Sequence, residues 1–305
     1  MTAIVISTGH KNWAIGHLAK LLNENLPHSF IVQFIQRRIH FLAFIKSFGH
    51  KNVENILFMH QELAVTNWNK SRLSSNGNTV IRFTHNSTDL SKYVRQLNMV
   101  KAITVENSNS KKFLINLGVS PKIIHIIPHP VDTKIFYSMP LLKKRDVIFI
   151  STLTERKNPQ LILNTIKFNQ DIKFTIFGKS WQKWAKFSDL IKLENLIYLE
   201  FDYDTYPKIL NQHKVFCSLS SLEGGPVPLI EALACELNVV VTDTGHARDV
   251  IKYPKTYNII PTNSDYLIVS NAIRMALSDK SLLSSDVSQY SYENYISRMK
   301  KLIYF

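Results

Sequence analysis

The feature that most constrains this chain is the alternation of short β-branched apolar runs with helical patterns along its length. Apolar runs of four to six residues are each bounded by turns or by segments whose apolar residues recur at helical spacing. Such alternation predicts parallel sheets whose two faces are covered by helices. The expected strands are residues 3–7, 30–35, 55–59, 80–84, 102–106, 123–127, 147–150, 174–177, 196–201, 215–219 and 239–242.

The alternating pattern restarts after a turn-rich segment, residues 128–144, which contains three prolines. A chain of 305 residues has room for about two domains. We therefore expect an N-terminal lobe over 1–138, a C-terminal lobe over 139–285 and a terminal helix within 286–305 that packs back toward the N-terminal lobe. The expected helices are residues 17–25, 39–48, 110–117, 159–168, 206–212, 229–235, 265–277 and 292–303.

The composition excludes several classes of protein. Hydrophobic residues make up 45% of the chain and charged residues 20%, which favours a packed core over disorder. No apolar run reaches the roughly 20 residues that a bilayer-spanning helix needs, and the first residues carry no secretory signal. Two cysteines, Cys217 and Cys235, are too few for a disulfide framework or a zinc site. We expect a cytoplasmic protein.

The chain is also strongly basic, with 37 Lys and Arg against 23 Asp and Glu and a formal net charge of +14. This excess favours polyanionic partners, namely nucleic acid, an anionic membrane surface or a phosphorylated ligand. No nucleic-acid-binding motif accompanies the charge, so we expect phosphorylated ligands and the inner face of a membrane rather than nucleic acid. A basic surface without a dedicated partner is the plain alternative.

The most informative local motif is the stretch SSLEGGPVPLIEA, residues 220–232. Glu223 is expected just past a strand. Pro228 suits the first turn of the next helix, and we expect Glu231 in that same turn. The two carboxylates are therefore predicted to converge on one strand-to-helix junction, although acidic residues near a helix start also serve simply as caps.

The residues between the two glutamates favour an anionic ligand. Gly224 and Gly225 let a ligand approach the backbone closely. The helix N-terminus at Pro226 and Val227 presents N–H groups and the positive end of the helix dipole to a phosphate. Because carboxylates accept hydrogen bonds from sugar hydroxyls, the junction suits a ligand with both hydroxyls and a diphosphate, such as a nucleotide sugar.

This motif resembles the E-x7-E signature of the retaining GT-B glycosyltransferases of family 4. The following residues 232–245, the upstream stretch GVSPKIIHIIP at 118–128 and the loop STLTERKNP at 151–159 are similar to the family in the same order. The resemblance covers roughly residues 100–305, whereas the first hundred residues match only in pattern. It implies an α/β GT-B fold, in which two Rossmann-like lobes with parallel sheets face each other across a cleft.

The resemblance also implies roles for individual residues. Glu231 would hold the ribose hydroxyls of the donor, and Glu223 would contact the transferred sugar. Lys157 would bind the diphosphate, where a cation offsets the charge that grows on the leaving group. The family usually has an arginine at the position of Thr152, and our hypothesis is that Arg156 supplies that charge from within the same loop.

Two strand ends carry further candidates. His85 follows the expected strand 80–84 and matches a first-lobe histidine that, in the family, faces the donor sugar. Gly178 follows the strand 174–177 and is expected on the donor side. An isolated histidine at such a position is also compatible with a structural role.

Three segments carry weaker signals. Gly9, His10 and Lys11 are expected on the acceptor side, or in a plain connecting loop. The basic and aromatic segment 37–46 suits an anionic membrane surface, or a core-facing helix with basic edges. The sequence Asp-Tyr-Asp at 202–204 mimics a metal-binding motif of other glycosyltransferases, but the GT-B architecture needs no metal, and we expect none and no prosthetic group.

Together these features predict a retaining glycosyltransferase. We expect it to use a UDP- or GDP-linked sugar and to act on a glycan or lipid-linked acceptor, in the synthesis of a cell-surface polysaccharide or glycolipid. The alternatives are a catalytically degenerate relative that binds nucleotide or glycan without turnover, and a sugar-nucleotide epimerase on the same architecture.

Overall fold

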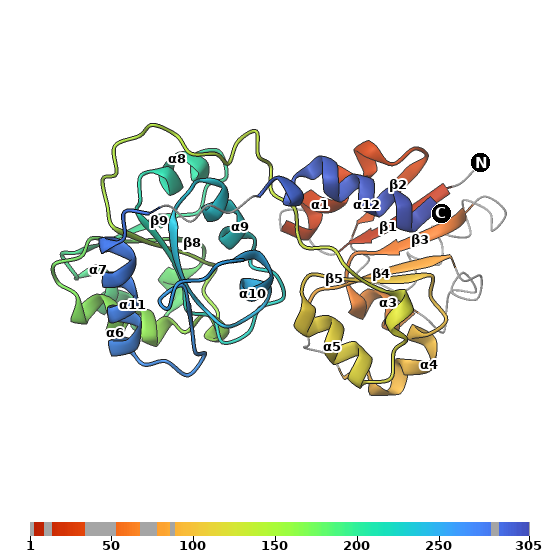
Figure 1. Ribbon diagram of the computed structural model, residues 1–305, viewed down its shortest axis with the longest axis horizontal. Coiled ribbons are helices and arrows are strands. Elements are labelled where there is room, and N and C mark those ends of the chain that lie inside the picture. The colour runs from red at the N-terminus through yellow and green to blue at the C-terminus, as the bar shows by residue number, and fades with distance from the viewer. Residues whose placement is uncertain are drawn as a thin grey trace. The chain divides into compact units, whose positions relative to one another are not determined.

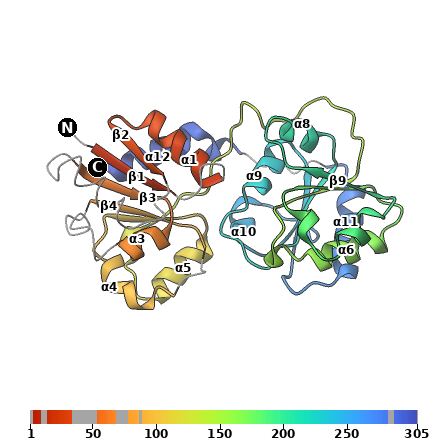
Figure 2. The same ribbon diagram turned by 180° about the vertical axis from the view of Figure 1, so that it is seen from behind.

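The computed structural model describes residues 3–8, 14–33, 53–67, 78–85, 89–281 and 287–304. The chain divides into two compact units, one made of Met1–His129 with Glu293–Phe305 and the other of Pro130–Tyr292 (Figures 1 and 2). Each unit contains one six-stranded parallel sheet with helices on both faces, so the α/β class predicted from the alternating pattern is confirmed. None of the described helices has both the length and the apolar character of a membrane span.

The sheet of the N-terminal unit has the strand order β2-β1-β3-β4-β5-β6. The chain therefore leaves β1 for one side of the sheet and returns to its other side at β3. The elements of this unit are β1 (Ala3–Thr8), α1 (Ala14–Asn25), β2 (Ser29–Gln33), β3 (Val53–Phe58), α3 (Gln61–Asn67), β4 (Thr79–Phe83), α4 (Val94–Leu97), β5 (Ala102–Val105), α5 (Ser108–Asn116), β6 (Ile124–Ile126) and α12 (Tyr292–Tyr304).

Alternate residues of these strands point to opposite faces, and each face has its own core. One face packs against α1 and α12, through Leu18, Leu22, Met299 and Ile303 among others. The other face packs against α3, α4 and α5, through residues that include Ala64, Leu97 and Leu114. Helix α12, from the end of the chain, thus completes the N-terminal unit.

The sheet of the C-terminal unit has the order β12-β11-β10-β7-β8-β9. Here the chain runs outward from β7 to β9 and then returns to the other side of β7 at β10. The elements are β7 (Val147–Ile150), α6 (Pro159–Phe168), β8 (Phe174–Gly178), α7 (Phe187–Ile191), β9 (Leu196–Glu200), α8 (Tyr206–Asn211), β10 (Val215–Ser218), α9 (Val227–Ala234), β11 (Asn238–Thr242), α10 (Ala247–Val250), β12 (Ile259–Ile260) and α11 (Tyr266–Ser278).

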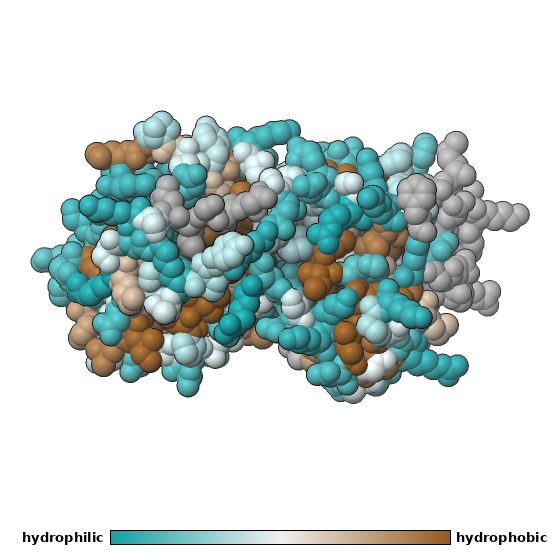
Figure 3. All heavy atoms as spheres, viewed as in Figure 1, coloured by the Kyte–Doolittle hydropathy of each residue, from teal (hydrophilic) through white to brown (hydrophobic). Residues whose placement is uncertain are grey.

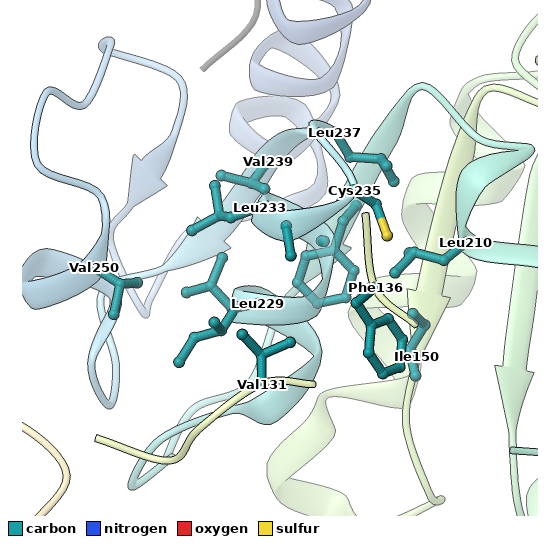
Figure 4. Close-up of a cluster of buried hydrophobic side chains, with 14 of the residues drawn as sticks. Val131, Phe136, Ile150, Leu210, Leu229, Leu233, Cys235, Leu237, Val239 and Val250 are labelled. Atoms are coloured by element: carbon teal, nitrogen blue, oxygen red, sulfur yellow. The ribbon is translucent and has the colours of Figure 1, made fainter. Parts of the chain in front are cut away.

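Two cores also flank this sheet. Helices α6, α7 and α11 cover one face, and α8, α9 and α10 cover the other. Figure 4 shows the second core, in which Leu229 and Leu233 of α9 lie among side chains of the sheet and of α8. Because α9 is buried over most of its length, its position is fixed, and so is that of Glu231, which it carries.

The outer helices leave some apolar side chains in solvent. Phe168 at the end of α6 is about half exposed, as are Ile268 and Met275 on α11. Figure 3 shows apolar surface over this part of the C-terminal unit, within a surface that is otherwise largely hydrophilic. These side chains lie outside both cores of the unit.

Most elements lie where the sequence patterns predicted them, within one to three residues. The strand 147–150 and the helix 159–168 are confirmed at both ends. One detail of the central motif was wrong: α9 begins at Val227 and has no acidic residue in its first turn, so Glu231 lies in the second turn. The expected helix 39–48 lies outside the described residues.

Candidate active site

The candidate site of the C-terminal unit lies at the carboxyl edge of its sheet, at the two neighbouring strands from which the chain continues to opposite sides. Strands β7 and β10 are hydrogen-bonded neighbours, but the chain leaves β7 toward β8 and leaves β10 toward β11 on the other side. The chain therefore continues in opposite directions along the sheet after these two strands, and ligands of open α/β sheets bind at such a switch point. The loops are residues 151–158 after β7 and 219–226 after β10.

These two loops are tied to each other by direct hydrogen bonds. The side-chain amide of Asn158 donates to the carbonyl of Leu219 at 2.6 Å, and the backbone N–H of Ser221 donates to the carbonyl of Arg156 at 2.8 Å. Asn158 has φ +53°, a conformation that asparagine tolerates better than most residues. It ends the 3₁₀ turn Glu155–Lys157, and so fixes the two cations of that turn against the second loop.

Glu223 pairs with both of these cations. Its Oε2 lies 2.7 Å from Nη1 of Arg156, and its Oε1 accepts a hydrogen bond from Nζ of Lys157. The Glu223 side chain is only 8% exposed, that of Lys157 16% and that of Arg156 44%. Burial alone would raise the pKa of Glu223, but the two cations outweigh it and hold the pKa below its usual value. The carboxylate is therefore ionised, and the site holds two cations around one anion.

A glycine with a left-handed backbone conformation and a buried histidine pack against the loop 219–226. Gly245 has φ +57°, and a Cβ on it would lie 2.9 Å from the carbonyl oxygen of Gly224 and 3.0 Å from Cβ of Glu223. His246 is fully buried, and burial lowers its pKa to about 4. The ring is therefore neutral, and its Nε2–H donates to the carbonyl of Pro226 at 3.2 Å. The sequence showed Gly245 only as the last residue of the stretch that resembles the family, and it did not single out His246, because the contacts of both are with a loop twenty residues earlier.

The start of α9 offers fewer amides than the motif led us to expect. Pro226 at the N-cap and Pro228 in the first turn carry no N–H, and the N–H of Leu229 donates to the carbonyl of Pro226 at 3.0 Å. Val227 is therefore the first-turn residue whose N–H remains for an anion, and no side chain caps this helix. The cations Arg156 and Lys157 supply formal positive charge at the same junction.

Glu231 lies in a separate, buried environment. The hydroxyl of Tyr206 donates to its Oε2 at 2.6 Å, and Glu231 is only 6% exposed. Burial raises the pKa of Glu231 to about 7, against the opposing effect of the Tyr206 hydrogen bond. Tyr203 and Tyr292 share a hydrogen bond. Burial raises the pKa of both tyrosines, and the negative charge of Glu231 raises it further. Local sequence patterns do not reveal this tyrosine cluster, because Tyr203 and Tyr206 come from one segment and Tyr292 from another far along the chain.

The other donor-side candidates have clear structural surroundings. A Cβ on Gly178 would lie 1.8 Å from the carbonyl oxygen of Ser151, so glycine is required where β8 passes the start of the β7 loop. The indole N–H of Trp181 donates to that same oxygen at 2.9 Å. Thr152 follows in the loop and is exposed. Of the expected donor residues, Arg156 and Lys157 contact Glu223, whereas Glu231 accepts a hydrogen bond from Tyr206.

His85 belongs to the N-terminal unit and follows β4. Its Nδ1 lies 3.0 Å from Oγ1 of Thr84, and its backbone carbonyl accepts a 2.8 Å hydrogen bond from Nε2 of Gln61. The imidazole ring of His60, which follows β3, lies edge-on to that of His85 with 5.9 Å between ring centroids. Gln61, Thr84 and His60 were not among the residues that sequence patterns had singled out.

Three weaker predictions have different outcomes. Gly9, His10, Lys11 and the segment 37–46 lie outside the described residues. Asp202 caps a local turn: its carboxylate accepts hydrogen bonds from the hydroxyl of Thr205 at 2.9 Å and from the N–H of Asp204 at 3.2 Å. Within the described part of the chain, no three His, Cys, Asp or Glu side chains form a group suited to a metal ion.

Comparison with solved structures shows the class of fold. The chain resembles Anabaena Alr3699/HepE, solved in complex with UDP and glucose, with a TM-score of 0.80 and 14% identity over 99% of this chain and 98% of that one. Sucrose-phosphate synthase from Thermosynechococcus elongatus gives 0.78 and 13% over 99% and 98%. The lipopolysaccharide outer core galactosyltransferase WaaB gives 0.72 and 14% over 100% and 99%. The chain therefore has the GT-B fold.

The family follows from the sequence. The family model "Glycosyl transferases group 1" matches residues 133–294, slightly more than half of the chain. This protein is a member of the group 1 glycosyltransferase family, as the motifs of residues 151–159 and 220–232 had indicated.

Curated relatives match over a shorter span. The phosphatidylinositol N-acetylglucosaminyltransferase GPI3 subunits of Saccharomyces cerevisiae strains YJM789 and RM11-1a are 24% and 23% identical over 215 residues. The matches cover 63% of this chain and 47% of those proteins. The chain thus spans about half the length of the curated relatives it matches.

Proposed function

We propose that this chain transfers a sugar from a nucleotide-sugar donor to a glycan or lipid-linked acceptor, with retention of the anomeric configuration. The observation that carries the proposal is the arrangement of Arg156 and Lys157 around Glu223 at the switch point of the C-terminal sheet. The two cations suit the diphosphate of a nucleotide sugar, and the ionised carboxylate suits the hydroxyls of its sugar.

In this proposal the donor diphosphate takes over the cations from Glu223. Lys157 and Arg156, with the N–H of Val227, hold the phosphates and offset the charge that develops on the leaving group. Glu223 is then released to accept hydrogen bonds from hydroxyls of the transferred sugar. The acceptor hydroxyl attacks from the face that the phosphate leaves, and the departing phosphate takes its proton. No protein nucleophile is needed for this step.

Glu231 is proposed to bind the ribose of the donor. Tyr206 occupies Oε2, and no other hydrogen bond to this carboxylate occurs among the described residues, so Oε1 remains as an acceptor for ribose hydroxyls. In the N-terminal lobe, His85 is proposed to face the donor sugar, and residues 9–11 the acceptor.

The relatives suggest which substrates to test first. Alr3699/HepE was solved with UDP and with UDP-glucose, and the yeast relatives are named for transfer of N-acetylglucosamine to phosphatidylinositol. We therefore propose a UDP-linked donor, with UDP-glucose and UDP-N-acetylglucosamine as the leading candidates and GDP-linked sugars next. The excess of 14 positive charges supports a lipid-linked acceptor reached at the cytoplasmic face of an anionic membrane.

The test is a thermal-shift screen of nucleoside diphosphates and nucleotide sugars, followed by product analysis. A bound donor raises the unfolding temperature by mass action. Turnover with the best donor is then followed by mass spectrometry, and the anomeric configuration of the product by NMR. Glu223→Gln should abolish turnover, whereas Glu236→Gln should not, because Glu236 is an exposed glutamate two residues past the far end of α9. An inverted product would overturn the retaining mechanism.

A second function is favoured by one specific feature. Glu223 already satisfies both cations, and Thr152 stands where the family usually has arginine, which suits a relative that binds nucleotide without turnover. Donor stabilisation without any hydrolysis or transfer, equal in wild type and Glu223→Gln, would favour this second function.

A further inference from the structure

The end of β11 and the segment that follows it hold the loop 219–226 at both of its ends. Oγ1 of Thr242, the last residue of β11, donates to the carbonyl of Ser220 at 2.5 Å. Nε2 of His246 lies 3.2 Å from the carbonyl oxygen of Pro226. The second contact lies where the loop ends and α9 begins, so His246 acts on the start of that helix.

The proton of His246 has one position that fits this contact. The carbonyl oxygen of Pro226 only accepts hydrogen bonds, so Nε2 of His246 carries the ring proton and donates it. The side chain is fully buried, and its Nδ1 has no hydrogen-bond partner among the described residues. Burial lowers the pKa of His246 to about 4, against the Pro226 hydrogen bond and the charges of Asp249 and Glu223. Near pH 7 the ring is therefore a neutral donor.

The acceptor of this hydrogen bond shares a peptide group with the first amide of α9. The carbonyl of Pro226 and the N–H of Val227 belong to one planar trans unit, so they point in opposite directions. The carbonyl also accepts the N–H of Leu229 at 3.0 Å, and it therefore points into the helix. The N–H of Val227 then points out of the N-terminus of α9. A partner that holds the carbonyl thus also fixes the direction of this amide.

The helix lacks the local groups that usually fix its first turn. Serine, threonine, aspartate or asparagine at the N-cap normally does so through a side-chain hydrogen bond, but the N-cap of α9 is Pro226, and no side chain caps this helix. Pro228 in the first turn has no N–H. A hydrogen bond from His246, twenty positions later in the chain, takes the place of a cap.

We propose that His246 is a positioning residue that aims the N–H of Val227 at the diphosphate of the donor, acting through the carbonyl of Pro226. The proposal rests on the proposed nucleotide-sugar function for the identity of its ligand. A donor on the carbonyl and an anion on the N–H of the same peptide strengthen each other, because hydrogen bonds in series polarise the group between them. His246 thus acts through one peptide group rather than by contact with the ligand.

The role of the amide is tested by a variant that removes the N–H and suits the existing backbone. Val227→Pro places proline at the first helical position, where it is favoured, and Pro226 already has the extended conformation that precedes a proline. The reference is Val227→Ala, which also lacks the valine side chain but retains the N–H. Relative to this reference, Val227→Pro should raise the dissociation constant for UDP at least about tenfold, as expected for a hydrogen bond to a charged group. Equal affinities of the two variants in isothermal titration overturn the proposal.

A double-mutant cycle tests whether His246 acts through this amide. His246→Phe removes the donor but keeps a ring, and it should weaken UDP binding severalfold. His246→Gln retains an N–H donor of similar reach and should restore part of the affinity. In the Val227→Pro background, His246→Phe should cause no further loss, because the group that it aims is gone. Losses that multiply in the double variant would show general support of the loop and would overturn the proposal.

The matched control is His213, a second buried and neutral histidine. Its Nε2 lies 2.7 Å from Oγ1 of Thr175, and burial lowers its pKa to about 4. It lies just before β10, at the opposite edge of the sheet from the loop 219–226. His213→Phe should leave the affinity for UDP unchanged. A loss equal to that of His246→Phe would count against a specific role of His246.

NMR of the full chain labelled with ¹⁵N-histidine reports on the hydrogen bond itself, and the wild type alone suffices for the first result. The His246 signal is assigned with His246→Gln, and we expect the Nε2–H form without ligand. Addition of UDP should move the Nε2–H proton downfield, because the carbonyl becomes a stronger acceptor. The shift should be absent in Val227→Pro at saturating UDP. A proton on Nδ1, or an Nε2–H signal that UDP leaves unmoved in the wild type, overturns the proposal.

Turnover separates this proposal from the proposed function. If the wild type binds UDP with the coupling described but transfers no sugar, the role of His246 stands and the proposed transfer fails. If it transfers sugar while Val227→Pro binds UDP as well as Val227→Ala does, the transfer stands and the role of His246 fails. A wild type that binds neither UDP nor GDP overturns both.

Discussion

The hydroxyl of Tyr206 donates a 2.6 Å hydrogen bond to Oε2 of Glu231, and both side chains are buried in the C-terminal unit. Burial raises the pKa of Glu231 to about 7, and the Tyr206 hydrogen bond limits the rise. The residue proposed to hold the donor ribose is therefore half protonated near neutral pH. Its protonation links donor binding and folding stability to pH, and three of the predictions below use this link.

Donor affinity should rise as the pH increases through 7, because the ionised carboxylate is the stronger acceptor for ribose hydroxyls. With a pKa of about 7, the dissociation constant at pH 6 should be roughly tenfold that at pH 8. Isothermal titration with UDP-glucose measures this, since its diphosphate stays ionised throughout. Glu231→Gln should bind UDP-glucose weakly, with a dissociation constant that does not change between pH 6 and pH 8. An equal change in both proteins contradicts the role of Glu231.

Tyr206→Phe should move the midpoint of this pH dependence upward. The Tyr206 hydroxyl stabilises the ionised form of Glu231, so its loss raises the pKa further. Donor binding at pH 7 should weaken, while binding at pH 9 should approach that of the wild type. A uniform loss of affinity at every pH would indicate that Tyr206 acts on packing alone.

Glu231→Gln should stabilise the chain at pH 8 but not at pH 4. The folded pKa is raised, so the contribution of Glu231 to stability is present below the unfolded pKa and is lost as the pH rises through 7. Above pH 7, the raised pKa of Glu231 reduces the free energy of unfolding by at most roughly 3 kcal/mol. His213 and His246, whose pKa burial lowers to about 4, act in the opposite direction in both proteins. The difference in Tm therefore isolates Glu231, and a difference independent of pH would refute this assignment.

Lys157→Met should weaken UDP-glucose binding at least about tenfold, because it removes a charged partner of the diphosphate. Turnover should fall about a hundredfold as charge on the leaving group goes uncompensated. The matched control is Lys214→Met, which removes a lysine paired with Asp146 at 2.8 Å just before β10, at the opposite edge of the sheet. Steady-state kinetics and titration compare them, and equal losses would show a general charge effect.

Gly245→Ala should destabilise the fold by about 1–3 kcal/mol and also impair donor binding. Its φ of +57° strains any other residue, and the added methyl would push on Gly224 and Glu223. Gly118→Ala, at φ +102° with its nearest neighbour at an ordinary 3.4 Å, should show strain alone. Chemical denaturation and titration separate the two effects; unchanged donor affinity in Gly245→Ala would mean that this contact does not shape the site.

Much of the fold could be read from the sequence because strands and helices follow local patterns. The helix at 159–168 has a proline in its first turn and an apolar face, and it forms as predicted. The strand at 147–150 is a short apolar run buried on both faces, and it too is found as predicted. Glu231 was predicted in the first turn of α9 but lies in the second, because the helix begins directly after its N-cap Pro226. Local patterns define the ends of elements least sharply.

The arrangement of the site depends on contacts between distant segments. Glu223 and Arg156 are 67 positions apart in numbering, and only the order of strands places the loops after β7 and β10 side by side. The same holds for Tyr206 with Glu231, and for Gln61 with Thr84 and His85. No pattern in the sequence specifies which strand lies next to which, so these partners could not be read from it.

The sequence by itself determined most of the elements, the two parallel sheets and the motif that carries Glu223 and Glu231, because backbone propensity and hydrophobic spacing act over a few residues. It did not predict the short elements α3, α4, α7, α10 and β12. The tertiary structure alone decided the ionisation of each carboxylate. Glu223 is held ionised by two cations from another loop, whereas Glu231 is drawn toward neutrality by burial. Charge and desolvation act through space, and their balance is fixed only when the chain has folded.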